Sequence, residues 1–377
     1  MKQHFSRHIQ NTKGVLFIAS FLCLFSASCT DETSSSPSCL NEYDLSPLLA
    51  NYADQVIAPR YADFEKEFSQ LYTGGSVFLT SPSLENLQSL RSSFISSYQS
   101  WQYVAPFDFG PAEKHFLLST FNNFPLNEGK AYADAIEKNL NFSSPDDYNK
   151  GLPLLDYFLY GIGSTDQAII DSFTTNPLLA EYTQAVLDDM KDKLTIVLDE
   201  WGEYRNTFIA NTGTQDGESL SLLINAFNKD YEFIKRNKVG VSSGVLSLGF
   251  TNPKEIEAFH SELSTLLIKE AIQSSRYLFK GNTTNADNGE GIEEVLRTLN
   301  AKKNGINLAD VILEQYLKIE DHLERVNGPL SLAVDDDKED IIDLYNSMSE
   351  QVIYIKSDLP SVLCVPITYV DNPSDSD

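Results

Sequence analysis

The chain has 377 residues, of which 42% are hydrophobic, and it contains 22 Phe and 18 Tyr. This composition is enough for one large domain or two ordinary ones with real cores, and it excludes a chain that is disordered throughout. The formal net charge is −26, and no basic patch in the sequence offsets it. An acidic surface repels phosphate backbones, so nucleic acid is excluded as a partner.

Residues 1–28 have the pattern of an export signal. Basic residues lie near the start, Val15 to Phe25 is an apolar run too short to span a bilayer comfortably, and small residues then precede Cys29. The segment "LFSASC" resembles a bacterial lipobox, in which the cysteine is lipidated and becomes the mature N-terminus. We therefore predict a lipoprotein signal peptide over residues 1–28 and a lipid on Cys29. The alternative is an ordinary signal peptide with a chance cysteine.

Residues 29–41 have the composition of a polar tether. Lipid chains on Cys29 would attach the protein to a bacterial membrane without spanning it. The acidic start of "TDETSSSPS" resembles the surface-export signal of Bacteroidetes lipoproteins. These features predict an outer membrane lipoprotein on the periplasmic or the cell-surface side.

Cys39 and Cys364 lie near opposite ends of the predicted folded region. Because exported proteins meet an oxidising compartment, two such cysteines form a natural pair. A disulfide between them would close a very long loop, worth about 4–5 kcal/mol in the chain-entropy description. The alternative is two buried free thiols.

Helical periodicity dominates the rest of the chain. Apolar residues recur at steps of three and four from Leu49 to Leu71, after Ser46–Pro47, and from Leu179 to Phe208, after Asn176–Pro177. Both dipeptides are typical of a helix N-terminus. Further helices are predicted at 83–104, 131–140, 216–236, 290–300, 306–326 and 338–357.

One more helix is predicted to start at Asn252–Pro253, with Glu255 placed for a capping box. Period-two alternation is nearly absent, and only "VLCVPITYV" near the end resembles a strand. The fold class is therefore all-α. We predict two helical-bundle-like domains packed together, an N-terminal bundle over 42–211 and a C-terminal bundle over 212–377.

Catalytic and metal-binding motifs are scarce. The predicted mature chain has three histidines, His115, His260 and His322, and it lacks the HExxH, CxxC, GxSxG and Walker patterns. His260 and Glu262 are two residues apart on a predicted helix, so they point different ways. We interpret His260 as a surface or core histidine rather than as a metal ligand.

The stretch "GLPLLDYFLYG", residues 151–161, places one carboxylate among large apolar side chains. Pro153 suits the first turn of a helix, and Asp156 then lies about one turn from the helix start. A carboxylate there needs a partner. That partner is either the protein, such as Lys238 or a cluster of backbone N–H groups, or a bound cation.

Several segments together resemble the imelysin-like family. The stretch "SWQYVAPFDFGP" resembles its W…F-x-FGP signature, "FNNFPLN" its FP segment, and "INAFNKDYEFIKRNKVG" its segment ending in K-I-G. "GLPLLDYFLYG" lies where these proteins carry G-x-H-x-x-E. The resemblance extends over nearly all of residues 42–377. It implies two helical bundles with a site near their interface. The family that it resembles is linked to iron uptake and carries a metallopeptidase label.

The chain departs from the family motif at two positions. The motif histidine falls on Pro153, which has no donor atom for a metal, and the glutamate falls on Asp156, which keeps the charge. Metal binding through Asp156 is therefore left open, and we expect no catalytic residue. The resemblance places the ligand pocket at seven residues: Gly151, Pro153, Asp156, Tyr157, Trp101, Phe109 and Lys238.

These observations favour a lipid-anchored, non-enzymatic binding protein for iron or an iron-containing ligand. Its partners would be the bacterial membrane, that ligand and proteins of an uptake system, and no cofactor is expected to be required for folding. One alternative is a metallopeptidase of the imelysin type, which needs at least three protein ligands to a metal and an open position. A second alternative is a cell-surface protein-interaction module with an exposed apolar patch.

Overall fold

The computed structural model describes residues 40, 43–142, 149–241, 243–283, 289–336 and 338–369. The predicted signal peptide, Cys29, Cys39 and nearly all of the predicted tether lie outside these residues. Cys364 is disulfide-bonded, and its pairing with Cys39 stays a prediction. Among the described residues, every helix is too short or too polar to cross a membrane.

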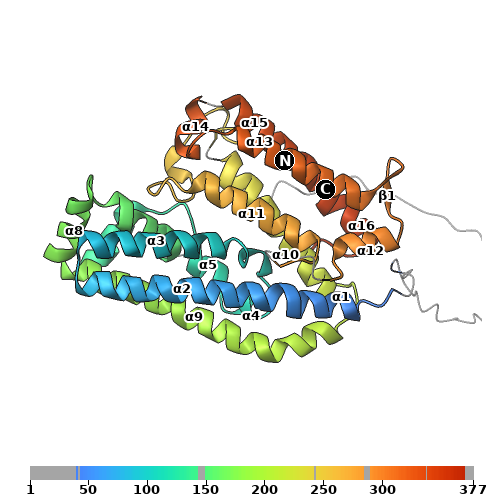
Figure 1. The fold of residues 1–377 in the computed structure, drawn as a ribbon, viewed down its shortest axis with the longest axis horizontal. Helices are drawn as coiled ribbons and strands as arrows, with labels where there is room; N and C mark the ends of the chain where they lie inside the picture. The colour runs from blue at the N-terminus through green and yellow to red at the C-terminus, as the bar shows by residue number, and fades with distance from the viewer. Residues whose placement is uncertain are drawn as a thin grey trace, which may run out of the picture. The chain divides into compact units, whose positions relative to one another are not determined.

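The described part of the chain is mostly helical. In its first group of helices, α2, α3 and α9 lie side by side (Figure 1). The predicted start at Asn176–Pro177 is confirmed, because the Asn176 side chain accepts the Leu178 N–H and α9 continues to Ala210. Ser83 and Thr165 cap α3 and α8 in the same way. The elements of this group are α1 (Ser46–Asn51), η1 (Tyr52–Ile57), α2 (Ala58–Thr80), α3 (Leu84–Trp101), η2 (Ala105–Phe107), α4 (Pro111–Lys114), α5 (Leu117–Phe121), α6 (Glu128–Glu137), α7 (Gly151–Asp156), η3 (Tyr157–Gly161), α8 (Asp166–Thr175) and α9 (Pro177–Ala210).

A second group follows, in which α13 packs against α15 and α11. Its one described sheet is an antiparallel pair in which Lys302 is opposite Asn307. The elements are α10 (Ser219–Phe233), η4 (Ile234–Gly240), η5 (Pro253–Glu255), α11 (Ser264–Phe279), α12 (Ile292–Thr298), β1 (Lys302–Lys303), β2 (Ile306–Asn307), α13 (Leu308–Arg325), α14 (Leu330–Asp336), α15 (Lys338–Val352), η6 (Ile353–Asp358) and α16 (Leu359–Leu363).

The all-α prediction is confirmed. Residues Ser38–Asp377 form one compact unit, and the predicted division into 42–211 and 212–377 stays a prediction. Two local predictions are wrong. The segment "VLCVPITYV" ends α16 and continues without a strand as far as it is described, and Asn252–Pro253 starts only the single turn η5 before α11 begins at Ser264.

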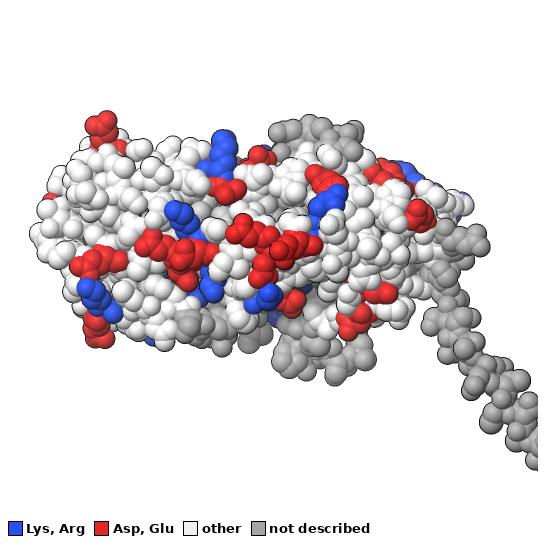
Figure 2. Space-filling model, turned by 90° about the horizontal axis from the view of Figure 1, so that it is seen from below, with Lys and Arg blue, Asp and Glu red and all other residues white. Residues whose placement is uncertain are grey.

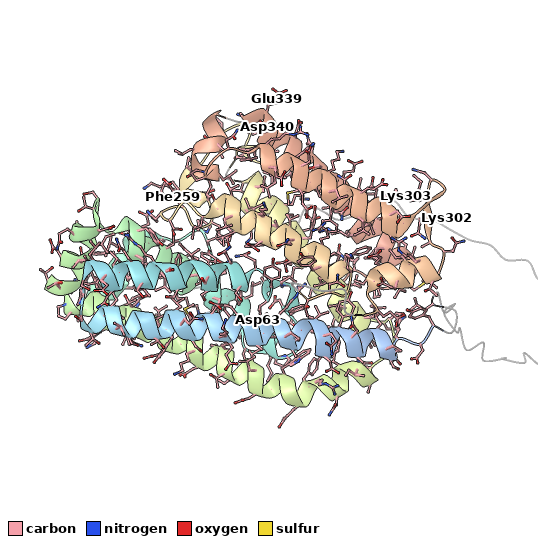
Figure 3. The ribbon with its side chains drawn as sticks, in the orientation of Figure 1. Asp63, Phe259, Lys302, Lys303, Glu339 and Asp340 are labelled. Atoms are coloured by element: carbon pink, nitrogen blue, oxygen red, sulfur yellow. The ribbon has the colours of Figure 1, made fainter. Side chains whose placement is uncertain are left out.

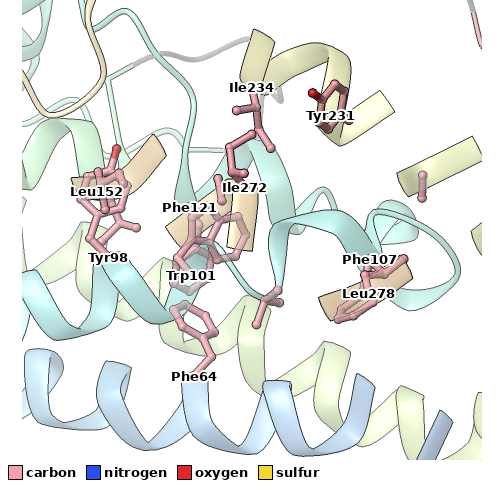
Figure 4. Packing of buried hydrophobic residues seen from close by; sticks show 14 of the residues in the cluster. Phe64, Tyr98, Trp101, Phe107, Phe121, Leu152, Tyr231, Ile234, Ile272 and Leu278 are labelled. Atoms are coloured by element: carbon pink, nitrogen blue, oxygen red, sulfur yellow. The ribbon is translucent and has the colours of Figure 1, made fainter. Parts of the chain in front are cut away.

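Aromatic rings fill the core between the helices. Phe121 stacks on Trp101 with ring centroids 4.9 Å apart, and Phe64 meets Phe121 edge-on at 5.1 Å (Figure 4). Such pairs are worth about 0.5–1.5 kcal/mol beyond their buried area. The chain is acidic, with a formal net charge of −26, and Figure 2 shows Asp and Glu side chains gathered across one face of the molecule.

The two groups are joined by a buried arginine that forms no ion pair with any carboxylate of the described residues. Arg60 of α2 is 1% exposed and donates hydrogen bonds to the carbonyl oxygens of Tyr103, Ser274 and Asn282 and to the Ser274 hydroxyl. Ser274 belongs to α11, so one side chain ties the first group to the second. Burial lowers the pKa of Arg60 to about 10, which leaves it charged at neutral pH.

Position 151, the first residue of α7, accepts only glycine without strain. Its φ is +76°, and a Cβ atom there would lie 2.5 Å from the Phe121 carbonyl oxygen. We expect Gly151→Ala to lower the free energy of unfolding by at least about 2 kcal/mol in urea denaturation. Gly217→Ala is the matched control, because Gly217 has φ +79° with open space around it and should lose only about 1 kcal/mol. Equal losses would show that the close contact has no energetic weight.

Candidate functional site

The residues of the predicted pocket separate into four places in the structure. Trp101 and Phe109 are 1% and 3% exposed, and their rings are part of the core, Trp101 against Phe121 and Phe109 stacked on Phe208 at 5.7 Å. Gly151 supports the close approach of α7 to α5. Pro153, Asp156 and Tyr157 lie together, and Lys238 lies in a separate polar network.

Asp156 is held by backbone N–H groups. Its side chain is almost fully buried, its Oδ2 accepts the His260 N–H and its Oδ1 accepts the Ser261 N–H, both at 2.9 Å. The N–H cluster is therefore the partner that Asp156 finds in the protein, rather than Lys238. Burial raises the pKa of the Asp156 carboxyl, and the two N–H donors oppose that rise.

Residues 256–263, here called the strap, supply both N–H groups. The strap follows η5 and precedes α11, and Phe259 marks its position in Figure 3. Ala258 and Glu262 have φ of +51° and +60°, a left-handed conformation that side chains rarely adopt. This backbone aims successive N–H groups at Asp156 and explains why a helix does not start at Asn252–Pro253.

His260 of the strap extends into the same region. Its Nε2 lies 3.1 Å from Glu128 Oε1, and its ring packs 5.3 Å from the Tyr157 ring. A Cβ atom on Gly161 would lie 2.4 Å from His260 Nδ1, so Gly161 makes room for the imidazole. The sequence interpretation of His260 as a surface or core histidine missed this position, because it assumed that His260 was on a helix.

A small cavity, here called the histidine pocket, lies where these side chains meet. Its volume is about 20 Å³, room for about one water molecule. Its walls include one imidazole and two carboxylates from separate segments of the chain. The lining residues are Phe124, Leu126, Glu128, Pro153, Asp156, Lys254, Ile256, Ala258, Phe259 and His260. Among the residues that the structure describes, no three His, Cys, Asp or Glu side chains are grouped closely enough to hold a metal ion.

Lys238 forms a separate, fully buried ion pair with Glu257 of the strap. Its Nζ lies 2.8 Å from Glu257 Oε2 and 2.6 Å from Gln102 Oε1. Asn122 also donates to Glu257, at 2.7 Å, and Tyr98 donates to Asn122. Lys238 is 3% exposed and Glu257 1%, so two desolvated charges depend on this set of hydrogen bonds.

A second cavity, here called the seam cavity, borders this network. Its volume is about 60 Å³, and it is lined by Ala105, Asp108, Leu118, Asn122, Ala226, Lys229, Asp230, Phe233 and Lys238. Elements of both helix groups form its walls. Sequence reasoning found Lys238 but missed Asn122, Asp230 and Glu257. Asn122 and Asp230 lie in segments that carry the family resemblance, which is the one signal that could have found them.

Comparison with known proteins identifies the family. The family model for imelysin, described as Peptidase_M75, matches residues 57–353. The match spans most of the chain, so this protein belongs to the imelysin family, as its sequence resemblance predicts. No curated protein matches the chain.

Two solved structures have the same fold. A structure described as an iron-regulated protein A precursor from Parabacteroides distasonis has a TM-score of 0.69 at 15% identity, covering 85% of this chain and 95% of that one. An imelysin-like protein from Psychrobacter arcticum has a TM-score of 0.68 at 20% identity, covering 86% and 96%. At these identities the likeness concerns the fold.

The buried ion pair gives a direct test of the network. We expect Lys238→Met to lower the free energy of unfolding by about 3–5 kcal/mol, because it leaves Glu257 buried without a cation. The double variant Lys238→Met/Glu257→Gln should recover much of that loss in urea denaturation. Lys229→Met is the control, because its pair with Asp108 is half exposed and should contribute at most about 1 kcal/mol. If the double variant loses the sum of the unfolding free energies that the two single variants lose, the two residues are not coupled.

Proposed function

We propose that this protein is a lipid-anchored, non-enzymatic binding protein of the imelysin family that acts at the outer membrane in uptake of iron or an iron-containing ligand. Family membership supports the class. The structural relative from Parabacteroides distasonis is described as iron-regulated, which supports iron as the cargo. The lipid anchor rests on the lipobox-like segment before Cys29.

The observation that carries the proposal is the donor set of the histidine pocket. Pro153 offers no donor atom at the position of the motif histidine, yet His260 and Glu128 enter the same pocket from other segments. Imidazole nitrogen and carboxylate oxygen are donors that iron accepts. Iron would therefore be held by Glu128, Asp156 and His260 after an adjustment of the strap, because Asp156 uses both oxygens on strap N–H groups.

This arrangement fits a carrier better than a hydrolase. A catalytic metal needs at least three fixed protein ligands and an open position for water. Here the imidazole belongs to His260 of the strap. The N–H groups of the same strap occupy the Asp156 carboxylate oxygens that a metal would need. Metal capture would exchange those hydrogen bonds, which suits reversible loading of a cargo.

Calorimetry tests the iron site. We expect saturable binding of ferrous iron under anaerobic conditions, of ferric citrate or of haem. His260→Ala should weaken the affinity at least about tenfold, since one strong ligand is worth more than about 1.4 kcal/mol. His322→Ala, on α13, is the control and should leave the affinity unchanged. Asp156→Ala should also weaken binding. Unchanged affinity in both pocket variants would remove the histidine pocket from the function.

The metallopeptidase alternative has its own test. Elemental analysis of purified protein is combined with a peptidase assay with and without chelator. We expect no chelator-sensitive peptide cleavage. Cleavage that is lost with chelator and restored by metal would establish the enzyme and end the carrier proposal.

The lipid anchor is tested by phase partitioning. The wild-type protein should enter the detergent phase of a Triton X-114 separation, because acyl chains add about 0.8 kcal/mol for each buried CH₂ group. Cys29→Ser should move the protein to the aqueous phase, whereas Cys23→Ser, inside the predicted signal peptide, should not. Detergent-phase recovery of the Cys29 variant would contradict lipidation at this residue.

A specific surface feature favours the interaction-module alternative as second candidate. Leu248 and Phe250 are 96% and 76% exposed in the segment between η4 and η5, and large exposed apolar side chains close together are typical of contact sites. Capture of a membrane protein by the wild type but not by Leu248→Ser/Phe250→Ser would support this function.

A further inference from the structure

Asp230 is an unusual lining residue of the seam cavity. It belongs to α10, and its side chain is partly buried at the boundary between the two helix groups. Among the residues that the structure describes, no donor forms a hydrogen bond with its carboxylate. A carboxylate that is partly withdrawn from water into an apolar setting loses hydration, and N–H or O–H donors can replace that hydration.

The cations around Asp230 have acceptors of their own. Lys238 of η4 is paired with Glu257 of the strap, and Lys229 of α10 is paired with Asp108 at 2.8 Å. Arg60 of α2 gives its hydrogen bonds to carbonyl and hydroxyl oxygens. These five groups are the charges that face Asp230, and none of them donates to it.

The remaining walls of the seam cavity are mostly apolar and are made by Ala105, Leu118, Ala226 and Phe233. Asn122 also lines the cavity, but its amide accepts a hydrogen bond from Tyr98 and donates one to Glu257. A volume of about 60 Å³ is room for several water molecules, or for a short aliphatic group. One hydrogen-bond acceptor with a negative charge, set among methyl and phenyl groups, is complementary to a donor that carries a positive charge on a short hydrocarbon stem.

We propose that the seam cavity binds the ammonium group of a small primary amine, with Asp230 accepting its N–H donors and the apolar walls covering its methylene groups. This inference goes beyond the proposed iron function and uses none of the residues of the histidine pocket. A divalent metal ion is less suited, because Asp108 already serves Lys229 and apolar walls supply no further oxygen ligands. An anion would meet the Asp230 charge directly.

The pH dependence of binding follows from the same residue. Burial raises the pKa of Asp230 to about 7, the nearby Lys238 ammonium opposes the rise, and Glu257 and Asp108 add to it. Aliphatic amines stay protonated well above this pH. The amine therefore competes with a proton for Asp230, and its affinity should fall about tenfold for each pH unit below 7.

The experiment is calorimetric titration of the protein with ethylammonium chloride at pH 8.5 and pH 5.5. We expect saturable binding at pH 8.5 and roughly 30-fold weaker binding at pH 5.5, the factor set by a pKa of about 7. Ethanol and acetate, as neutral and anionic probes of similar size, should bind far more weakly. If no binding of ethylammonium is detected up to about 100 mM at pH 8.5, the affinity is too weak for a specific site. That result would overturn the proposal.

Two variants locate the site. Asp230→Asn keeps the shape of the side chain, removes its charge and should lower the affinity at least about tenfold. Asp63→Asn on α2, an exposed residue labelled in Figure 3, is the control and should change nothing. Ala226→Leu fills the cavity without changing charge and should also prevent binding. Wild-type affinity in either cavity variant would overturn the proposal.

Folding of the Asp230 variant is monitored by thermal denaturation. A carboxyl whose folded pKa is raised stabilises the folded state at low pH and loses that contribution as the pH rises toward 7. Asp230→Asn should therefore be at least as stable as the wild type at pH 8.5, so loss of binding there would report on the ammonium contact. If this variant unfolds, the site is tested instead by measuring the Asp230 pKa of the wild-type protein by NMR, with and without ethylammonium. Ethylammonium should lower the Asp230 pKa, and an unchanged pKa would count against the site.

Discussion

The position of the strap depends on burying one lysine and one glutamate together. Removing a charged side chain from water costs several kcal/mol. For a buried pair, the attraction between the two charges offsets that cost only when other hydrogen bonds satisfy both side chains. Lys238 and Glu257 meet this condition through Gln102 and Asn122, which come from the first helix group. Asp156 fixes the far end of the strap through two backbone N–H groups. Ala258, between these anchors, and Glu262, just after them, adopt the left-handed conformation that side chains rarely take.

The same buried ion pair bears on how a cavity persists between the helix groups. An apolar gap normally closes as side chains relax into it, because each lost contact weakens packing. Here the Lys238–Glu257 pair stands at one wall of the seam cavity and the Lys229–Asp108 pair at its edge. Arg60 ties α2 to α11 through Ser274. Lys238 and Glu257 cannot move inward without losing the hydrogen bonds of a fully buried pair, which favours keeping the space beside Asp230 open.

Local features of the sequence were sufficient to predict the all-α class and the long helix α9, because apolar periodicity and the Asn176 cap act within a few residues. The strap was not predictable in this way. Its conformation is set by Asp156, which lies 104 residues from His260, and by the burial of Glu257. Trp101 and Phe109 illustrate the opposite error: their place in the family resemblance suggested a pocket, whereas their rings pack into the aromatic core. Which acids become buried depends on contacts between distant elements, so Asp230 carried no local signal.

Under the proposed correspondence of Pro153 to the motif histidine, a ligand at this site would be controlled differently from one in the family pattern. In the family pattern, the imidazole and the carboxylate share one helix, and their separation is fixed by the helix itself. In this chain the imidazole beside Asp156 belongs to His260, so its position depends on the strap. The strap also carries Glu257, the counter-charge of Lys238 in the seam cavity wall. The strap therefore contacts both pockets, through the His260 and Ser261 N–H groups at one end and through Glu257 at the other.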